Sequence, residues 1–472
     1  MKKTIQYISL LLLFIVTINL AKAQNKPSYR LPHFEKVQLP NGLMLYLMEK
    51  HDVPVISLYA IVPAGAVHDG NKAGLASLTG SCLKCGTKSF TKKEIEQQFD
   101  FLGASLYTYG SNDDAGLGTR FAKKDEAKIL SMIKELLVNP VFPDEEFNKE
   151  KKLTLTGLDQ AKESPASVID AYWNKFYYRD NVYGNVVSGT VTSVTPLTAE
   201  DARDFYKKFY NPAGSAIAVV GDFKISEMKA TLTKLFSEWK KIIPASKVAF
   251  QQVNTPTSAR VLLVNKDDAM ETTFYIGSPG ITRNNPDYLA ADVVNTFFGG
   301  KFTSWMNNEL RIKTGLTYGA FSYFDYNQHA GTFIISTHTA NATTQATIDK
   351  AIEVINRLHT QPIDEETLAS AKNYMIGMSP PEYQSTNQLA GLLIRMFWYG
   401  FDESYINNFE ANVNAVTVAK ANEVIAKYFP KDKLQFVLIG KASEIKPIAE
   451  KYGAVTEAEI KDDIGAKKNV NK

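Results

Sequence analysis

Apolar and polar residues alternate along the chain in short stretches that predict strands and helices in mixed order. Two apolar runs on either side of the Asn41-Gly42 turn are typical of a β-hairpin. A longer apolar run at Val55–Val62, ended by Pro63, predicts a further strand. Helical spacing of apolar residues follows at Leu75–Cys85 and again at Lys92–Leu102. These alternating signals predict an α+β fold.

One combination of elements, a helix ended by a proline and followed by a buried strand, occurs twice. The first copy begins at Thr198 and closes on Gly221, and the second begins at Thr417 and closes on Gly440. The same number of residues separates the two starts and the two ends. This regularity favours an internal duplication over two unrelated helix-proline-strand units. We therefore predict two duplicated α+β domains, each with a sheet flanked by helices.

The limits of these domains follow from changes in composition. We expect the first domain at residues 30–242 and the second at residues 258–447, joined by a linker that contains Pro244 and Pro256. Residues 448–472 end in a lysine-rich stretch, so we predict that they form a charged, solvated tail.

The N-terminal residues 1–23 have the pattern of a signal peptide. Two lysines precede the apolar run Ile8–Leu20, and small residues at positions 21 and 23 fit cleavage before Gln24. The alternative is an uncleaved anchor, but the run is shorter than the roughly 20 residues that span a bilayer. We therefore expect an exported protein, periplasmic or secreted, with no stable membrane anchor.

Composition excludes some classes of function and leaves others open. The formal net charge of +3 is small and the basic residues are scattered, so no nucleic-acid partner is expected. The only cysteines are Cys82 and Cys85. Their spacing fits either a redox dithiol or two small buried side chains one helical turn apart, and the sequence does not say whether they are bridged. No histidines occur at the spacing of a metal site.

Residues 74–87 read GLASLTGSCLKCGT and resemble a specific motif. They are similar to G-L-A-H-x-x-E-H-x-x-x-x-G-T of the pitrilysin/insulinase metallopeptidase family. In that family the two histidines bind zinc, the glutamate polarises the attacking water, and a second glutamate on a later helix is the third ligand. The resemblance covers nearly the whole chain beyond the predicted signal peptide.

The chain departs from the family at each of these four positions. Ser77 and Ser81 stand at the histidine positions, and Gly80 stands at the position of the general base. Gly157 falls at the position of the third ligand. Serine is a poor zinc ligand and glycine cannot act as a base. We expect no metal in this chain and no peptidase activity of the chain alone.

The second half carries a further family signal. A Gly-rich turn at Gly299 and Gly300 precedes R-x-x-x-G-L-x-Y, which begins at Arg311 and ends at Tyr318. The resemblance implies that these four residues bind substrate, with the Arg311 guanidinium on a peptide carbonyl and the Tyr318 hydroxyl on the developing oxyanion. The plainer alternative is an exposed arginine at a helix end and a half-buried strand tyrosine.

The resemblance also implies a role and a partner. In two-chain members of the family one subunit holds zinc and a sister subunit supplies the arginine and tyrosine, so that two clamshell halves enclose a peptide. We expect a non-catalytic subunit of an exported metallopeptidase heterodimer, with zinc on an HxxEH-bearing sister chain. The alternatives are a scaffold or a peptide-binding protein without a role in proteolysis. The family's peptide-docking edge strand corresponds here to Gly103–Tyr109, but the aromatic residues of this stretch depart from the family's pattern. An ordinary strand on the core is the equal alternative to a docking strand.

Overall fold

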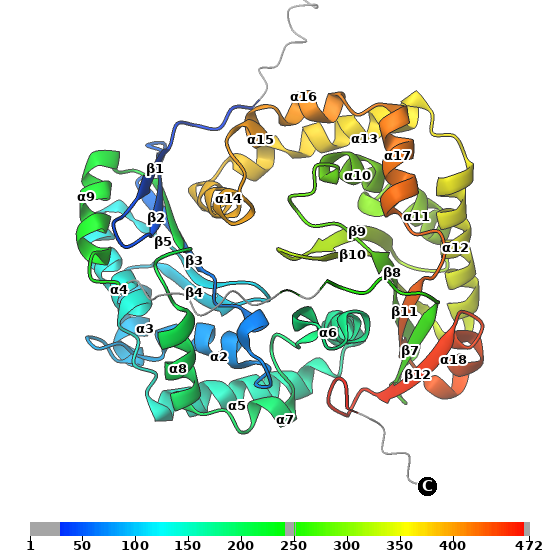
Figure 1. Cartoon of the computed structure of the whole chain (residues 1–472), viewed down its shortest axis with the longest axis horizontal. Coiled ribbons are helices and arrows are strands. Elements are labelled where there is room, and N and C mark those ends of the chain that lie inside the picture. The colour runs from blue at the N-terminus through cyan, green and yellow to red at the C-terminus, as the bar shows by residue number, and fades with distance from the viewer. Residues whose placement is uncertain (1–28, 241–249, 251, 467–472) are drawn as a thin grey trace, which may run out of the picture.

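Two six-stranded mixed sheets form the framework of the chain (Figure 1). The computed structural model describes residues 29–240, 250 and 252–466. The predicted signal peptide 1–23, the last two residues of the predicted first domain and the lysine-rich end 467–472 lie outside the described residues. Within the described ranges every helix is too short or too polar to cross a lipid bilayer.

The first sheet has the strand order β1-β2-β6-β3-β5-β4. Only β2 and β6 run parallel, and the other neighbours are antiparallel. The predicted hairpin and the predicted strand at Val55–Val62 are confirmed. The strands are β1 (Glu35–Gln38), β2 (Met44–Glu49), β3 (Val55–Val62), β4 (Ser105–Gly110), β5 (Ala115–Ala122) and β6 (Ala216–Gly221).

The second sheet repeats this topology, with the order β12-β7-β11-β8-β10-β9. Five strands correspond one to one with β2, β6, β3, β5 and β4 in position and direction, which confirms the two duplicated α+β units. The strands are β7 (Arg260–Asn265), β8 (Glu271–Pro279), β9 (Ala320–Tyr326), β10 (Gly331–Ala340), β11 (Gln435–Gly440) and β12 (Ala454–Glu459).

The sixth strand of the second sheet does not follow the duplication, and our prediction of a tail in this region is wrong. We predicted a charged tail over residues 448–472, but Ala454–Glu459 form β12, which pairs with β7 in parallel. In the first sheet the same edge is occupied by β1, which is antiparallel. Polar side chains are usual on edge strands because they prevent further pairing. The polar composition was therefore compatible with a strand as well as with a tail.

The repeated helices begin in the same way in both domains. The Thr198 side chain accepts a hydrogen bond from the Asp201 backbone at 3.2 Å, and the Thr417 side chain accepts one from the Lys420 backbone at 3.1 Å. Each threonine satisfies a backbone N–H that has no partner within the helix. The helices they begin, α8 (Ala199–Phe209) and α17 (Val418–Tyr428), lead into the buried strands β6 and β11.

Helices pack against the two sheets. The first domain contributes α2 (Leu75–Ser81), α3 (Lys92–Phe101), α4 (Glu126–Val138), α5 (Asp144–Ala161), α6 (Pro165–Tyr178), α7 (Val191–Val194), α8 and α9 (Ile225–Phe236). The second contributes α10 (Tyr288–Asn295), α11 (Trp305–Asn307), α12 (Thr344–Thr360), α13 (Glu365–Met378), α14 (Thr386–Tyr399), α15 (Ser404–Asn407), α16 (Phe409–Asn414), α17 and α18 (Ala442–Ala449). The predicted helix at Leu75–Cys85 is α2 followed by a 3-10 turn.

Two helices cross between the domains in the interior of the molecule (Figure 1). Helix α6 belongs to the first domain but packs on the second sheet, where Trp173 donates from Nε1 to the Thr332 hydroxyl at 3.2 Å. Helix α14 belongs to the second domain but packs on β3 and β6 of the first sheet. There the Thr386 and Ser57 hydroxyls are hydrogen-bonded at 2.8 Å. Each domain thus supplies one helix to the core of the other.

Candidate functional site

Helix α2 carries three of the four degenerate zinc positions, and a buried aspartate fixes its start. The Asp69 carboxylate accepts hydrogen bonds from the backbone N–H groups of Gly74 at 2.9 Å and Ala76 at 2.8 Å. Gly74 has a φ of 97°, which glycine adopts without strain. Burial raises the pKa of Asp69 to about 7, although the two N–H groups oppose that shift. The family's helix is therefore present and firmly held.

The edge strand β4 packs directly on the face of α2 where the general base would stand. A Cβ placed on Gly80 would lie 2.7 Å from the Gly110 nitrogen and closer still to the Tyr109 carbonyl. A Cβ placed on Gly110 would lie 2.6 Å from the Ala76 carbonyl oxygen. Both distances are too short for real atoms, so the two glycines allow this approach. A side chain at position 80 requires β4 to move.

The serines at the histidine positions belong to the same contact. Ser77 and Ser81 are both half-buried. The carbonyl oxygen of Ser81 accepts a hydrogen bond from the Thr108 hydroxyl of β4 at 3.1 Å. The predicted docking segment Gly103–Tyr109 is thus the edge strand of the first sheet, and it is held against α2. Peptide docking on it stays a prediction.

The fourth position lies on α5, which packs beside α2. Gly157 is exposed, and nothing would approach a Cβ there within 4 Å. No group of three or more histidine, cysteine, aspartate or glutamate side chains suited to a metal ion occurs among the residues that the structure describes. Ser77, Gly80, Ser81 and Gly157, the four positions that the resemblance assigns to the zinc site, lie on the neighbouring helices α2 and α5.

The two cysteines follow α2 in the 3-10 turn Cys82–Cys85. Both are free thiols in this structure, and both are completely buried. A hydrogen bond with Cys85 and burial raise the pKa of the Cys82 thiol. Because the thiolate is the reactive form, this environment favours the interpretation of small buried side chains over a redox dithiol.

The second set of predicted residues lies on the other domain, near the start of β9. Arg311 is part of a π-helical segment, Asn308–Lys313, and its guanidinium carbon is 4.6 Å from the centre of the Phe302 ring. Tyr318 precedes β9 and is 80% exposed, so it is not the half-buried strand residue of the alternative interpretation. Within the described part of the chain, neither side chain makes a hydrogen bond or ion pair with another group.

Buried and paired neighbouring residues hold the backbone that carries Arg311 and Tyr318 in place. Leu310 is completely buried in the core of the second domain. The neighbouring Glu309 carboxylate is paired with Arg357 at 2.6 Å and with Lys313 at 2.9 Å. The Asn307 side-chain oxygen accepts a hydrogen bond from the Ala320 backbone at 3.2 Å. The half-buried Arg311 and the exposed Tyr318 therefore stand on a fixed support.

The Gly-rich turn has a structural explanation at one of its two positions. A Cβ on Gly299 would lie 2.7 Å from the Ser322 backbone nitrogen, so glycine is needed for β9 to pack on this turn. Gly300 is exposed. Substrate binding by either glycine stays a prediction.

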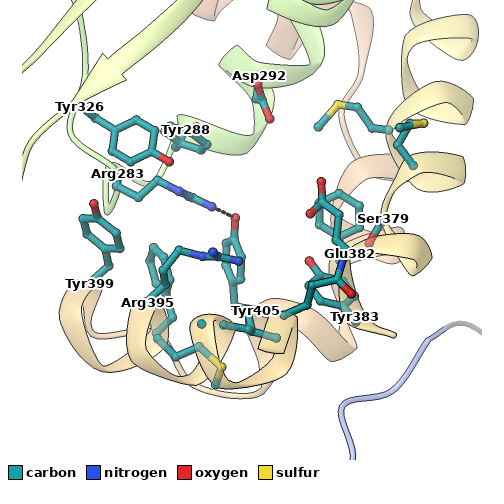
Figure 2. Close-up of a pocket in the computed structure, with 18 of the residues that line it drawn as sticks. Arg283, Tyr288, Asp292, Tyr326, Ser379, Glu382, Tyr383, Arg395, Tyr399 and Tyr405 are labelled. Atoms are coloured by element: carbon teal, nitrogen blue, oxygen red, sulfur yellow. Dashed lines mark hydrogen bonds between the residues drawn. The ribbon is translucent and has the colours of Figure 1, made fainter. Parts of the chain in front are cut away.

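Sequence reasoning missed one concave site altogether. A cavity of about 740 Å³ lies between α10, α13 and α14, and it contains Asp292 and Arg283 (Figure 2). These residues come from segments without a recognisable motif. The signal that was available is the concentration of tyrosines between residues 374 and 405.

Comparisons with known proteins agree on one family. The model of "Insulinase (Peptidase family M16)" matches residues 46–191, and the model of "Peptidase M16 inactive domain" matches residues 196–375. A "Non-peptidase homolog YmxG" of Helicobacter pylori is 21% identical over 440 residues, which cover 92% of this chain and 99% of that protein. An "Uncharacterized zinc protease" of Rickettsia felis is 23% identical over 353 residues, covering 73% and 82%.

A solved structure extends the comparison to three dimensions. The crystal structure of a peptidase M16 inactive domain from Pseudomonas fluorescens superposes with a TM-score of 0.81 at 26% identity. The superposition covers 87% of this chain and 98% of the other. Both duplicated domains are therefore included in the match.

Proposed function

Since the chain belongs to the insulinase family of peptidases, family M16, as a member of the inactive type, we propose that it is the non-catalytic subunit of an exported zinc metallopeptidase complex. In this complex it binds peptide together with a sister chain that carries an intact HxxEH motif. The zinc belongs to the sister chain, where it supplies the activated water. This chain supplies Arg311 and Tyr318.

The observation that carries this proposal is the contrast between the two predicted sites. The α2 face has lost its ligands and is covered by β4, whereas Arg311 and Tyr318 remain on an anchored support with their polar groups unpaired. Phe302 and Ile312 beside them are 54% and 59% exposed. Large exposed apolar side chains near functional groups are typical of a surface that a second chain covers.

The chemistry follows from the two functional groups. The Arg311 guanidinium is a rigid fork of donors and can bind the carbonyl oxygens of an extended peptide. The Phe302 ring, whose centre is 4.6 Å from the guanidinium carbon, attracts this cation and favours one position for it. The Tyr318 hydroxyl can donate to the oxyanion that forms when water attacks the scissile carbonyl. Neither the Arg311 guanidinium nor the Tyr318 hydroxyl has to break a hydrogen bond within the described chain before it can bind peptide.

A second candidate function is a peptide-binding or scaffold protein with no role in proteolysis. The cavity beside α14 favours it, because that cavity belongs to this chain alone and needs no partner to be complete. Purification of the native protein distinguishes the two functions. Our first proposal requires an HxxEH-bearing chain to copurify with this one.

Replacement of Tyr318 tests the catalytic part of the proposal. In the reconstituted complex, Tyr318→Phe removes one oxyanion donor, so we expect kcat for peptide cleavage to fall on the order of 10²-fold. Unfolding free energy should not change, because the ring is exposed. Steady-state kinetics and urea unfolding of the same preparations measure both quantities.

The matched control is Tyr452→Phe. This change removes a hydroxyl that donates to Asp349 at 2.7 Å, and Tyr452 precedes β12, at the opposite edge of the sheet from β9. It should leave kcat unchanged. If the Tyr318→Phe complex cleaves peptide as fast as the unchanged complex, the proposed role of this chain in catalysis is wrong.

A further inference from the structure

Tyrosine is the most frequent residue in the walls of the cavity between α10, α13 and α14 (Figure 2). Its volume of about 740 Å³ is in the range of sites that hold organic ligands and is far too large for a single ion. Seven tyrosines line it: Tyr59, Tyr288, Tyr326, Tyr374, Tyr383, Tyr399 and Tyr405. Aromatic rings present a negative face that attracts cations.

The walls already hold one cation of the chain itself. The Arg283 guanidinium carbon lies 4.0 Å from the centre of the Tyr288 ring, 5.0 Å from that of Tyr405 and 5.1 Å from that of Phe401. Arg283 also donates a hydrogen bond to the Tyr405 hydroxyl (Figure 2). Arg283 makes no ion pair with a carboxylate in the described residues. The rings and the Tyr405 hydroxyl therefore contact the guanidinium directly, while its charge acts on the Asp292 carboxylate at longer range.

Asp292 is a carboxylate in the cavity lining that has no hydrogen-bonding partner among the described residues. Its side chain points from α10 into the cavity (Figure 2). Within the described chain it makes no hydrogen bond and no ion pair, and burial raises its pKa to about 6 despite the charge of Arg283. An unpaired carboxylate in a partly dry site costs free energy unless a cation joins it.

The remaining walls suit the stem of a long basic side chain. Met375, Met378 and Met396 line the cavity on α13 and α14. Methionine is flexible and polarisable and packs well against alkyl chains of varied shape. Glu382 and Arg395 are exposed at the same cavity and are also without ion pairs in the described residues. They can hold the polar backbone to which such a side chain is attached.

We propose that this cavity binds the lysine or arginine side chain of a peptide, with the charged group on Asp292 and the alkyl stem against the methionines. Binding requires neither a sister chain nor Arg311 and Tyr318, which lie outside the cavity lining. The inference therefore stands or fails separately from the proposed role in catalysis.

The direct test compares peptides that differ only in charge. Isothermal titration of the full chain without partner uses acetyl-Ala-Lys-Ala-amide and the same peptide with norleucine in place of lysine. We expect the lysine peptide to bind at least tenfold more tightly.

Asp292→Asn should remove most of that difference, since it deletes a charge-assisted hydrogen bond without changing the shape of the side chain. The control Asp432→Asn neutralises an exposed carboxylate outside the cavity and should change nothing.

A second variant keeps the proposal testable should Asp292→Asn fail to fold. Gly391 faces the cavity from α14, and the nearest atom to a Cβ there is an Arg395 nitrogen at 3.9 Å. Gly391→Leu therefore fits the fold and places a bulky side chain in the cavity, so it should weaken binding of the lysine peptide at least tenfold. Equal binding of the two peptides, or unchanged lysine-peptide binding by both variants, would overturn the proposal.

A free organic cation is the other source of the same chemistry, and cadaverine serves as its probe. It carries the alkylammonium group of lysine without a peptide backbone. We expect it to bind at least tenfold more weakly than the lysine peptide. If cadaverine binds as tightly as the peptide, the ligand is a small amine and the peptide assignment is wrong.

Discussion

Two glycines at the degenerate zinc site differ in what surrounds them. Gly80 is enclosed by the backbone of β4, whereas Gly157 faces open space on α5. The loss of the general base is therefore built into the packing of the sheet edge on α2. The loss of the third ligand position has no such consequence, because a side chain at position 157 would meet nothing.

This difference predicts opposite effects of the same substitution. Gly80→Ala forces β4 away from α2 and should lower the free energy of unfolding by about 1–3 kcal/mol, as overpacking does elsewhere. Gly157→Ala lies in an exposed helix interior and should raise it by roughly 0.5–1 kcal/mol. Urea unfolding of the two variants measures both. Equal stability of Gly80→Ala and the unchanged chain would contradict the packing described for β4.

The residues of the zinc-site motif and of the arginine–tyrosine motif could be located from the sequence, because the residues that flank them are specific to the family. Gly74 and Gly157 fix the two ends of the degenerate frame, and Arg311 and Tyr318 stand at the spacing that the resemblance implies. Asp292 could not be located in this way. It is one aspartate in an ordinary helix, and only the packing of α13 and α14 beside that helix makes it a cavity residue.

Among the elements, the exchange of α6 and α14 was beyond sequence reasoning. The duplicated landmarks around Thr198 and Thr417 predicted two equivalent domains, and both α6 and α14 have an apolar face that is buried in the structure. An apolar face does not say which of two similar sheets it covers. Only the folded structure shows how closely α6 fits the second sheet at Gly277: a Cβ there would lie 2.3 Å from the Trp173 ring of α6.

The exchange predicts that a substitution in α14 destabilises the first domain. Leu393 is completely buried against the first sheet, so Leu393→Ala should cost about 2–5 kcal/mol of unfolding free energy. Proteolysis should then begin in β3 or β6 as well as in α14. Limited proteolysis with mass spectrometry locates the first cuts.

Leu153→Ala is the matched control, because Leu153 is 64% exposed on α5. It should change stability by less than about 0.5 kcal/mol. Cleavage of the Leu393→Ala chain that is confined to the second domain would show that α14 is not part of the first domain's core.

At the scale of the whole molecule, buried polar contacts join the domains in addition to the exchanged helices. The Asp113 carboxylate accepts hydrogen bonds from the Tyr183 hydroxyl at 2.7 Å and from the Gln328 backbone at 2.8 Å. Asn112 donates to the Asn327 side chain at 3.0 Å. Residues of the first sheet's β4–β5 turn thus meet those of the β9–β10 turn.

Several buried carboxyl groups give the molecule a shared pH dependence. Burial raises the pKa of Asp114, Asp292 and Asp325 to about 6, and that of Asp69 to about 7. A carboxyl group whose pKa is higher in the folded state binds its proton more tightly there. Its contribution to stability is complete below about pH 4 and is lost as the pH rises through 6 to 7.

We therefore expect the free energy of unfolding to fall between pH 5 and pH 8. Each pKa unit of difference corresponds to about 1.4 kcal/mol, so the total decrease should be on the order of 2 kcal/mol or more. Urea titrations at the two pH values measure it, and Asp292→Asn should make the slope shallower. A chain that is more stable at pH 8 than at pH 5 would contradict this assignment.

The crossing of α14 also has a consequence for the order in which the protein is made. Strand β6 leaves the ribosome roughly 165 residues before α14, an interval on the order of ten seconds at about 5–20 residues per second. Until then the apolar face of the first sheet around Met48 and Val220 lacks the α14 residues that pack on it in the folded protein. A transiently exposed apolar face of this kind favours aggregation of the incomplete chain until α14 has been made.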